Sequence, residues 1–339
     1  MNDESESQQE SESQHASEFP HESDLFQPPA VLNDTDAVAA VLGGGGSRGL
    51  AHLGVIHRLA TMRLDLRRVV GVSIGSLMAG LLASTRDVRD AESLARDYLA
   101  SPDYARLQRQ VLRVAGASTR DLTNRPSLTA KIRRLMAARS ALVSAVRQPA
   151  LLPESVPRRI VDALIPDVQI EDLRLPLAIV MVDLKSGRRI VQREGSLREA
   201  VLASMSIPGV FPPLQRGDQL LADIGVYDAV PCDVARGWMP ADEKLIAVDV
   251  SRATPSMARC RNAFESVLRF QELAEQRIRM QQLSLADIVV RPECGIVPWF
   301  DFGEAEKLIA AGHAAAWQTP AESMQCNLGD GLGKVVTTG

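Results

Sequence analysis

The sequence predicts an α/β protein with a mainly parallel central sheet, because short apolar runs alternate with helical segments from residue 37 onward. The run AVAAVL (37–42) is typical of a buried strand, and the segment 47–62 after it places apolar residues at helical spacing. A second pair repeats this order, with a strand expected at 67–73 and a helix at 74–84. Parallel strands need such crossovers, so the alternation indicates a parallel sheet with right-handed connections.

The later part of the chain continues this alternation. Further strands are expected in five apolar runs, at 175–184, 188–193, 219–223, 243–250 and 286–292. Further helices are expected at 196–206, 262–283 and 304–317. No internal repeat divides these elements, so they are expected to form one large domain over residues 37–318.

Three segments differ from this domain in composition or charge. Residues 1–36 contain ten Asp or Glu and no Lys or Arg, and their low apolar content predicts a disordered tail. Residues 104–149 hold ten Lys or Arg against one acidic residue, Asp121, and predict a basic helical insertion. Basic amphipathic helices can lie on anionic membranes, so peripheral membrane contact is one interpretation and a solvated helix face is the other. Residues 319–339 are expected to be a loose C-terminal tail.

Charge, apolar runs, cysteine spacing and aromatic content indicate a cell compartment and exclude some classes of partner. The formal net charge of the 339 residues is −4, and without the ten acidic residues of the tail it becomes about +6. No run approaches the ~18 apolar residues of a membrane span, and the N-terminus lacks the basic and apolar regions of a secretory signal. Four cysteines without CxxC spacing predict neither a metal site nor a disulfide framework, which fits a cytoplasmic protein. Aromatic residues make up 4% of the chain, so nucleic-acid binding is not expected.

A glycine-rich loop joins the first predicted strand to its helix. Gly44, Gly46 and Gly49 fit GxGxxG, which in dinucleotide-binding proteins places a pyrophosphate at a helix N-terminus. That kind of site also needs an acidic residue near the end of the second strand, whereas Asp65 precedes the second predicted strand. A nucleotide-binding oxidoreductase is therefore the weaker interpretation. The stronger one is a loop whose N–H groups meet an oxyanion that forms during a reaction.

A GxSxG motif, Gly71-Val72-Ser73-Ile74-Gly75, lies where the second predicted strand meets the next helix. At such a junction a sharp turn lifts the serine above the edge of the sheet, and the small glycines permit that turn. The N-terminal dipole of the following helix also points toward the serine oxygen. Because neighbouring parallel strands end at the same sheet edge, Ser73 and the glycine loop are expected to face one site.

A nucleophilic serine needs a base that accepts its proton. His52 and His57 lie in the first predicted helix, too near the glycine loop to resemble the late-chain histidine of an α/β-hydrolase. His313 lies in the last predicted helix and stays a candidate. Asp223 directly follows an apolar strand and comes two residues before a glycine, a position that suits a carboxylate facing a site.

Three motifs in this order, GGGxRG, GxSxG and a late Asp-x-Gly, resemble those of the patatin-like phospholipases. The similarity covers about residues 37–316, with weaker echoes in VDLKSG and LREAVLASMSIPGVFPPL. The resemblance implies a three-layer α/β/α sandwich that hydrolyses acyl esters of lipids or phospholipids without a metal or cofactor. It also implies that Ser73 is the nucleophile and Asp223 the general base.

The same resemblance assigns roles to the glycines and to one arginine. It implies that the N–H groups of Gly44, Gly45 and Gly46 form the oxyanion hole and that Arg48 helps to orient this loop. The remaining motif glycines shape the surrounding turns: Gly49, Gly71, Gly75 and Gly225.

One residue departs from the family pattern. The family usually has Asp-Gly-Gly or Asp-Gly-Ala, and this chain has Asp223-Ile224-Gly225. A β-branched isoleucine disfavours the positive φ that glycine permits, so either the turn has ordinary dihedrals or Asp223 is displaced. The sequence therefore predicts a lipid acyl hydrolase of phospholipase, lysophospholipase or esterase type. The alternative is a catalytically weak or inactive relative that binds lipid or regulates.

Overall fold

The computed structural model describes residues 36–114, 150–251, 260, 262–295, 297–298, 300–315 and 317–318. Apart from Asp36, the expected acidic tail lies outside these residues, as do 115–149 of the expected basic insertion and the expected C-terminal tail. Their boundaries stay predictions. Within the described ranges, no helix combines the length and the apolar character needed to span a bilayer.

A single sheet runs through the described residues, with strand order β5-β6-β3-β2-β1-β7-β8-β9 and with β4 also paired to β3. Its centre is parallel, as the sequence predicted: β1 lies between β2 and β7, β2 also pairs with β3, and β7 with β8. The bounds of these five strands are Ala37–Leu42 (β1), Asp65–Val72 (β2), Leu177–Asp183 (β3), Lys244–Val248 (β7) and Ile288–Val290 (β8).

The outer strands are antiparallel to their neighbours. They are Arg189–Gln192 (β4), Leu214–Arg216 (β5), Gln219–Ala222 (β6) and Trp317–Gln318 (β9). Strands near β4 and β6 were expected from the sequence, but β5 and β9 were not, because they are too short to show a two-residue period.

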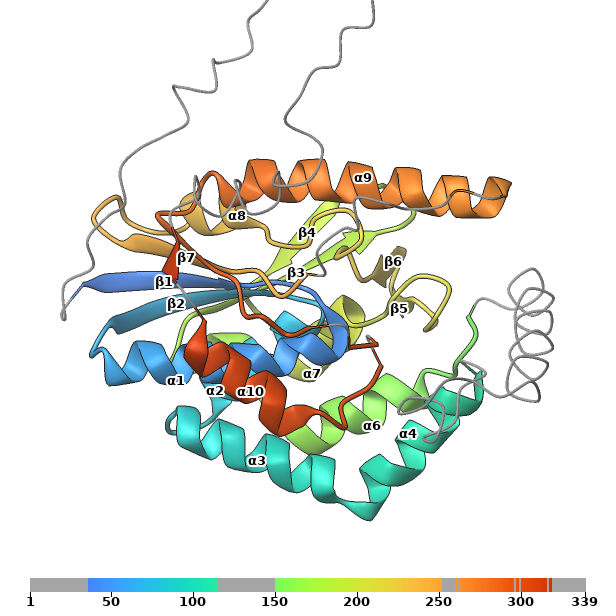
Figure 1. Cartoon of the computed structure of the whole chain (residues 1–339), viewed down its shortest axis with the longest axis horizontal. Coiled ribbons are helices and arrows are strands. Elements are labelled where there is room, and N and C mark those ends of the chain that lie inside the picture. Colours follow the sequence, from blue (N-terminus) through green and yellow to red (C-terminus); the bar gives the residue numbers. More distant parts are fainter. Residues whose placement is uncertain are drawn as a thin grey trace, which may run out of the picture.

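Helices cover both faces of the sheet (Figure 1). One face carries Ala51–Thr61 (α1), Ile74–Ser84 (α2), Leu197–Ser204 (α7) and Ala305–Ala314 (α10). The other carries Cys232–Arg236 (α8) and the long helix Ala263–Leu283 (α9). Strand β1 shows why two layers are needed, because Val38 and Ala40 pack into one core and Ala39 and Val41 into the other. The predicted three-layer α/β/α arrangement is confirmed.

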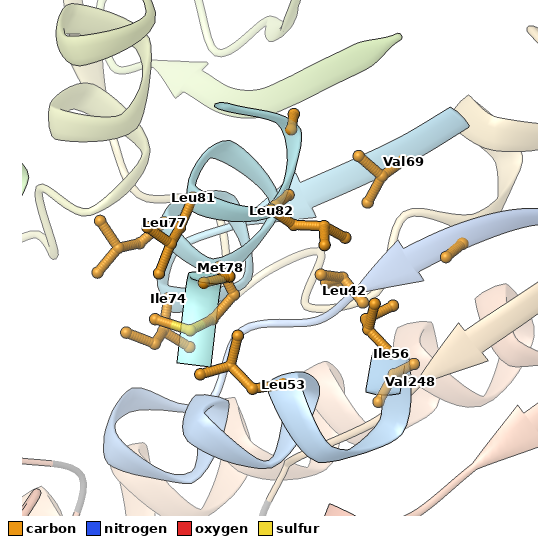
Figure 2. Close-up of a cluster of buried hydrophobic side chains, with 14 of the residues drawn as sticks. Leu42, Leu53, Ile56, Val69, Ile74, Leu77, Met78, Leu81, Leu82 and Val248 are labelled. Carbon is orange, nitrogen blue, oxygen red and sulfur yellow. The ribbon is translucent and has the colours of Figure 1, made fainter. Parts of the chain in front are cut away.

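The larger core lies between the sheet and the layer of α1, α2, α7 and α10. Figure 2 shows its centre, where Leu53 and Ile56 of α1 and Met78 of α2 lie in one cluster with Leu42 of β1. Full burial of such a side chain contributes roughly 1.5–3 kcal/mol. This packing fixes α2, and with it the serine that precedes α2, against the sheet.

Three helices form an outer shell beneath that layer (Figure 1): Val88–Ala100 (α3), Pro102–Val114 (α4) and Ser155–Leu164 (α6). Only the α4 region was expected to be helical. Asp87 is the N-cap of α3, and its side chain accepts hydrogen bonds from the N–H groups of Arg89 and Asp90. Helix α6 buries Val156, Val161 and Leu164 on one stripe. A short 3-10 helix, Gly46–Leu50, leads into α1, and another lies at Ile170–Asp172.

Candidate active site

Ser73 occupies a sharp turn between β2 and α2. Its backbone has φ 55° and ψ −127°, a conformation that residues other than glycine rarely adopt. The turn is held from α7, because Ser73 N donates to Ser204 Oγ (2.9 Å), which itself donates to Val180 O (2.8 Å). Strain of this kind costs about 1–3 kcal/mol and persists only where the surroundings enforce it. It places Ser73 at the N-terminus of α2, 8% exposed.

The motif glycines allow backbone to pack against this turn. A Cβ on Gly75 would lie 2.6 Å from the carbonyl carbon of Leu42, and one on Gly71 would lie 2.6 Å from a backbone atom of α2. A Cβ on Gly49 would lie 2.9 Å from Cβ of Ile74. Real Cβ atoms essentially never approach other heavy atoms this closely, so α2, β1 and the 3-10 helix Gly46–Leu50 can meet at Ser73 only with glycine at these positions.

The glycine loop passes directly beside Ser73. A Cβ on Gly44 would lie 3.5 Å from Cβ of Ser73. However, Gly44 N donates to Ala229 O (2.9 Å), so the prediction that its N–H serves an oxyanion is corrected for this residue. Within the part of the chain that the structure describes, the N–H groups of Gly45 and Gly46 have no acceptor. These two N–H groups are the donors that remain for an oxyanion.

Two side chains hold the loop in place. Arg48 Nε donates to Gly45 O (3.1 Å), and the orienting role expected for this arginine stays a prediction. His52 Nε2 lies 2.8 Å from Gly43 O and donates its proton to that carbonyl. Burial lowers the pKa of His52 to about 4, so the imidazole is neutral near pH 7 and holds the loop rather than exchanging protons.

Asp223 reaches the same place from the end of β6. Ala222 pairs with Val182 of β3, while Val72 at the end of β2 pairs with Val180 of the same strand. The ends of β2 and β6 therefore lie two residues apart along β3. Because β6 runs antiparallel to β3, its chain continues toward the turn after β2 rather than away from it.

The Asp223 carboxyl is buried, 5% exposed, and hydrogen-bonded. Its Oδ1 accepts from Gly225 N (2.6 Å), and a Cβ on Gly225 would lie 3.7 Å from Cβ of Ser73. Burial raises the pKa of Asp223 to about 6, against the lowering effect of hydrogen bonds from Ser73 and Gly225 N. A carboxyl with a pKa near 6, bonded to a serine hydroxyl, can accept a proton near neutral pH.

Ile224 fits without strain. Among the described residues that carry a side chain, only Arg63 and Ser73 have a positive φ, so Ile224 has ordinary dihedrals. Its side chain is 1% exposed and packs in the core beneath α8 and α9 with Val72 and Ala229. The sequence left two alternatives for this departure from the family pattern, a turn with ordinary dihedrals or a displaced Asp223. The structure shows a turn with ordinary dihedrals.

A second buried carboxylate, Asp249, follows β7 at the same edge of the sheet. Its Oδ2 accepts from Arg279 Nη1 (2.7 Å) and Arg291 Nε (2.9 Å). Burial alone would raise its pKa, but these two guanidinium groups hold the pKa well below its ordinary value. Asp249 therefore stays ionised and paired with two arginines, whereas the raised pKa of Asp223 allows its carboxyl to gain and lose a proton near neutral pH.

Two residues weighed in the sequence analysis lie elsewhere. His313 lies with His57 and Glu92, 3.7 Å from Glu92 Oε1, and does not line the pocket beside Ser73. Asp65 begins β2 and so lies at the opposite edge of the sheet from Ser73. His313 is therefore not placed to accept the proton of Ser73, and Asp65 is not placed where a dinucleotide site needs its acidic residue.

An apolar pocket opens beside Ser73, which is one of its lining residues. Loop residues Ile207 and Phe211 line it, in the segment SIPGVFPPL that follows α7. The other walls come from α4, α6 and the loop before α10: Tyr104, Leu107, Gln108, Val111, Val156, Pro157, Ile160, Phe300 and Phe302. The shape and composition suit an acyl chain.

Most of this pocket was not predicted from the sequence. Val156, Pro157 and Ile160 lie on α6, which was not expected, and Phe300 and Phe302 lie in a loop far along the chain. A helical stripe of apolar residues over 155–164 was the one signal that could have revealed α6.

The family model described as patatin-like phospholipase matches residues 40–236, more than half of the chain. This chain belongs to the patatin-like phospholipase family.

Relatives within and beyond bacteria share the family's domain. An uncharacterized NTE family protein of Mycobacterium tuberculosis is 27% identical over 304 residues, covering 83% of this chain and 46% of the relative. Patatin-like phospholipase domain-containing protein 6 of Homo sapiens is 30% identical over 217 residues, covering 63% of this chain and 13% of the relative. This patatin-like chain therefore spans less than half the length of these relatives.

Among solved structures, VipD of Legionella pneumophila is similar to this chain at TM-score 0.41 and 13% identity, over 88% of this chain and 68% of that one. The type III effector ExoU matches at TM-score 0.35 and 14% identity, over 86% of this chain and 53% of that one.

Proposed function

We propose that this patatin-like protein is a serine-dependent lipid acyl hydrolase that acts through Ser73 and Asp223. The observation that supports it best is the pairing of a strained serine with a buried carboxyl whose pKa is raised to about 6. An apolar pocket adjoins this pair. The proposed substrates are acyl esters of lipids or phospholipids.

The proposed reaction begins when Ser73 Oγ attacks the ester carbonyl and Asp223 takes the hydroxyl proton. The N–H groups of Gly45 and Gly46 stabilise the oxyanion, and the loss of one such donor typically costs about 10²- to 10³-fold in rate. The intermediate collapses to an acyl-serine, and the leaving alcohol takes the proton back from Asp223. Water, activated by Asp223, then hydrolyses the acyl-serine to the free acid and restores Ser73.

Labelling by a fluorophosphonate probe tests the nucleophile. Wild type is expected to be labelled at Ser73 and to hydrolyse p-nitrophenyl esters, and Ser73→Ala is expected to lose both. Ser84→Ala is the matched control, because Ser84 ends the same helix and, among the residues that the structure describes, its hydroxyl bonds only to Leu81 O. Folded wild type that takes no label and leaves a range of phospholipids intact would overturn the proposal and favour the lipid-binding alternative.

Bulk added inside the pocket tests its role as the acyl site. Val111 of α4 lines the pocket, whereas Arg109 of the same helix is exposed. Val111→Trp is expected to lower kcat/KM for long-chain esters about tenfold or more relative to short-chain esters, because a lost acyl contact is worth ~1–3 kcal/mol. Arg109→Trp adds bulk outside the pocket and is expected to leave that ratio unchanged. An equal loss for short and long chains in Val111→Trp would contradict this role.

Contact of the basic segment 104–149 with an anionic membrane stays a prediction. The described part of that segment, in α4, turns Tyr104 and Leu107 toward the pocket and leaves Arg106 and Arg109 exposed.

A further inference from the structure

Three side chains with metal-ligating atoms converge on the side of the molecule formed by α1, α3 and α10, apart from Ser73. His57 lies on α1, Glu92 on α3 and His313 on α10, and one ligand atom of each lies within 4.8 Å of the others. Helix α1 contacts both α3 and α10, as Figure 1 shows. Among the described residues, no other group of three His, Cys, Asp or Glu side chains converges in this way.

Both imidazoles face the same carboxylate oxygen. His57 Nδ1 lies 2.9 Å from Glu92 Oε1, and His313 Nε2 lies 3.7 Å from it. The first distance is a hydrogen bond, but the second is too long for one. The two rings meet edge to face, with their centroids 4.8 Å apart.

The other carboxylate oxygen is held from outside. Arg96 Nη1 donates to Glu92 Oε2 (3.0 Å), and Arg96 Nε donates to Glu306 Oε1 (2.8 Å) on α10. This contact orients Glu92 so that Oε1 stays directed at the two imidazoles, as outer hydrogen bonds do at metal sites. Glu92 is 5% exposed, so its position is fixed by packing as well.

We propose that His57, Glu92 and His313 bind a divalent transition-metal ion, with Zn²⁺ the ion that this donor set suits best. Two imidazole nitrogens and one carboxylate oxygen are common Zn²⁺ ligands, and a water molecule can complete a tetrahedral site. The ion gives His313 Nε2 a partner that the carboxylate alone does not. The side chains of His57 and His313 are 23% and 39% exposed, which leaves the site open to solvent.

The proposed ion would tie α10 to α1 and α3. The loop that leads into α10 carries Phe300 and Phe302, which form one wall of the pocket beside Ser73. The proposed role of the ion is therefore structural, and the ion takes no part in the proposed hydrolysis. The sequence does not reveal the site because its ligands come from three separate helices rather than from one spaced motif.

Metal binding to the chelator-treated full chain tests the proposal. Wild type is expected to bind one Zn²⁺ more than the double variant His57→Asn and His313→Asn, whose side chains keep their polarity. Co²⁺ is expected to give visible absorption bands in wild type that the double variant lacks. At a hundredfold excess of Zn²⁺ over Kd, the Tm of wild type is expected to rise by about 5–10 °C, with no rise in the double variant.

Three single variants distinguish binding at these ligands from binding elsewhere on the chain. The thiol of Cys260 is exposed and offers Zn²⁺ a ligand outside the proposed site. Because the proposed site does not include it, Cys260→Ser is expected to keep the extra Zn²⁺ and the Co²⁺ bands. Glu306→Gln weakens the support of Arg96 without removing a ligand and is expected to keep binding. Glu92→Gln, which preserves shape, is expected to weaken Zn²⁺ binding at least tenfold. Equal Zn²⁺ binding by wild type and the double variant, or a Tm that Zn²⁺ does not change, would overturn the proposal.

Discussion

Asp223→Asn is expected to lower ester hydrolysis by about 10²- to 10⁴-fold, because a carboxamide cannot accept the proton of Ser73. The substitution keeps the size of the side chain and an oxygen that can accept from Gly225 N, a contact of 2.6 Å in the structure. The loss is expected in kcat rather than in KM, since Asp223 does not line the acyl pocket. Steady-state kinetics with p-nitrophenyl esters measure both.

The pH profile gives a second readout of the same group. Burial raises the pKa of Asp223 to about 6, and only the ionised carboxylate acts as a base. The kcat/KM of wild type is therefore expected to fall about tenfold per pH unit below pH 6 and to level off above pH 7. A profile without an inflection between pH 5 and 7 would argue against Asp223 as the group that titrates.

Stability is expected to move in the opposite direction from activity. A folded-state pKa above the ordinary value of 3.8 means that the carboxyl favours folding when protonated, below about pH 4, and that this contribution is lost as pH rises through 6. At pH 8 the ionised, buried group costs up to about 3 kcal/mol. Asp223→Asn is therefore expected to unfold at the same or a higher urea concentration than wild type at pH 8.

Asp228→Asn is the matched control for this experiment. Asp228 lies on the same loop, is 3% exposed and pairs with Arg189 Nη1 (2.8 Å), away from Ser73. Its loss is expected to leave kcat within a few-fold of wild type. If Asp223→Asn kept more than a tenth of wild-type kcat, or if Asp228→Asn lost as much, the assignment of the base would fail.

The central part of the fold could be predicted from the sequence because its signals are local. The runs 37–42 and 67–73 end at glycine motifs, and the helix expected at 74–84 is the one observed. Adjacent parallel strands end at one edge whatever else surrounds them, so the meeting of Ser73 with the glycine loop followed from strand order alone.

The contacts that complete the site depend on pairing between distant segments. The sequence pointed to Asp223, but only the antiparallel register of β6 on β3 shows how its carboxyl reaches Ser73. In the same way, Gly44 was expected to offer its N–H to an oxyanion, and the bond to Ala229 O that occupies it links the ends of two separate loops. A strand pattern indicates which residues alternate and not which neighbour they pair with.

Helix α3 and the pocket-lining helix α6 were not predicted from the sequence for a different reason. Helices α3 and α6 are only 13 and 10 residues long, so the apolar stripe that marks each of them spans few positions in the sequence. Their stability comes from packing on the layer above rather than from propensity. Residues that meet through such packing, such as Ile160 of α6 and Phe302 before α10, share no sequence signal.

Gly75→Ala is expected to destabilise the folded chain by more than about 4 kcal/mol, among the largest losses that a single added methyl group produces. The new Cβ would lie 2.6 Å from the carbonyl carbon of Leu42 and 2.8 Å from Gly43 O. These are backbone atoms of β1 and the glycine loop, held by parallel pairing on both sides, so they cannot move away cheaply. Urea unfolding followed by circular dichroism measures the loss.

Gly80→Ala on the same helix separates this steric effect from helix propensity. Its Cβ would lie 3.3 Å from Cδ1 of Ile165 and 3.4 Å from Cγ2 of Val201, both ends of side chains that can adjust. Alanine is also favoured over glycine in a helix by about 0.8–1 kcal/mol, so the net change is expected to stay within about 1 kcal/mol of wild type. If Gly75→Ala proved as stable as Gly80→Ala, then α2 would not lie against β1 as described. The strained turn at Ser73 depends on that contact, so the proposed nucleophile would lose its structural basis as well.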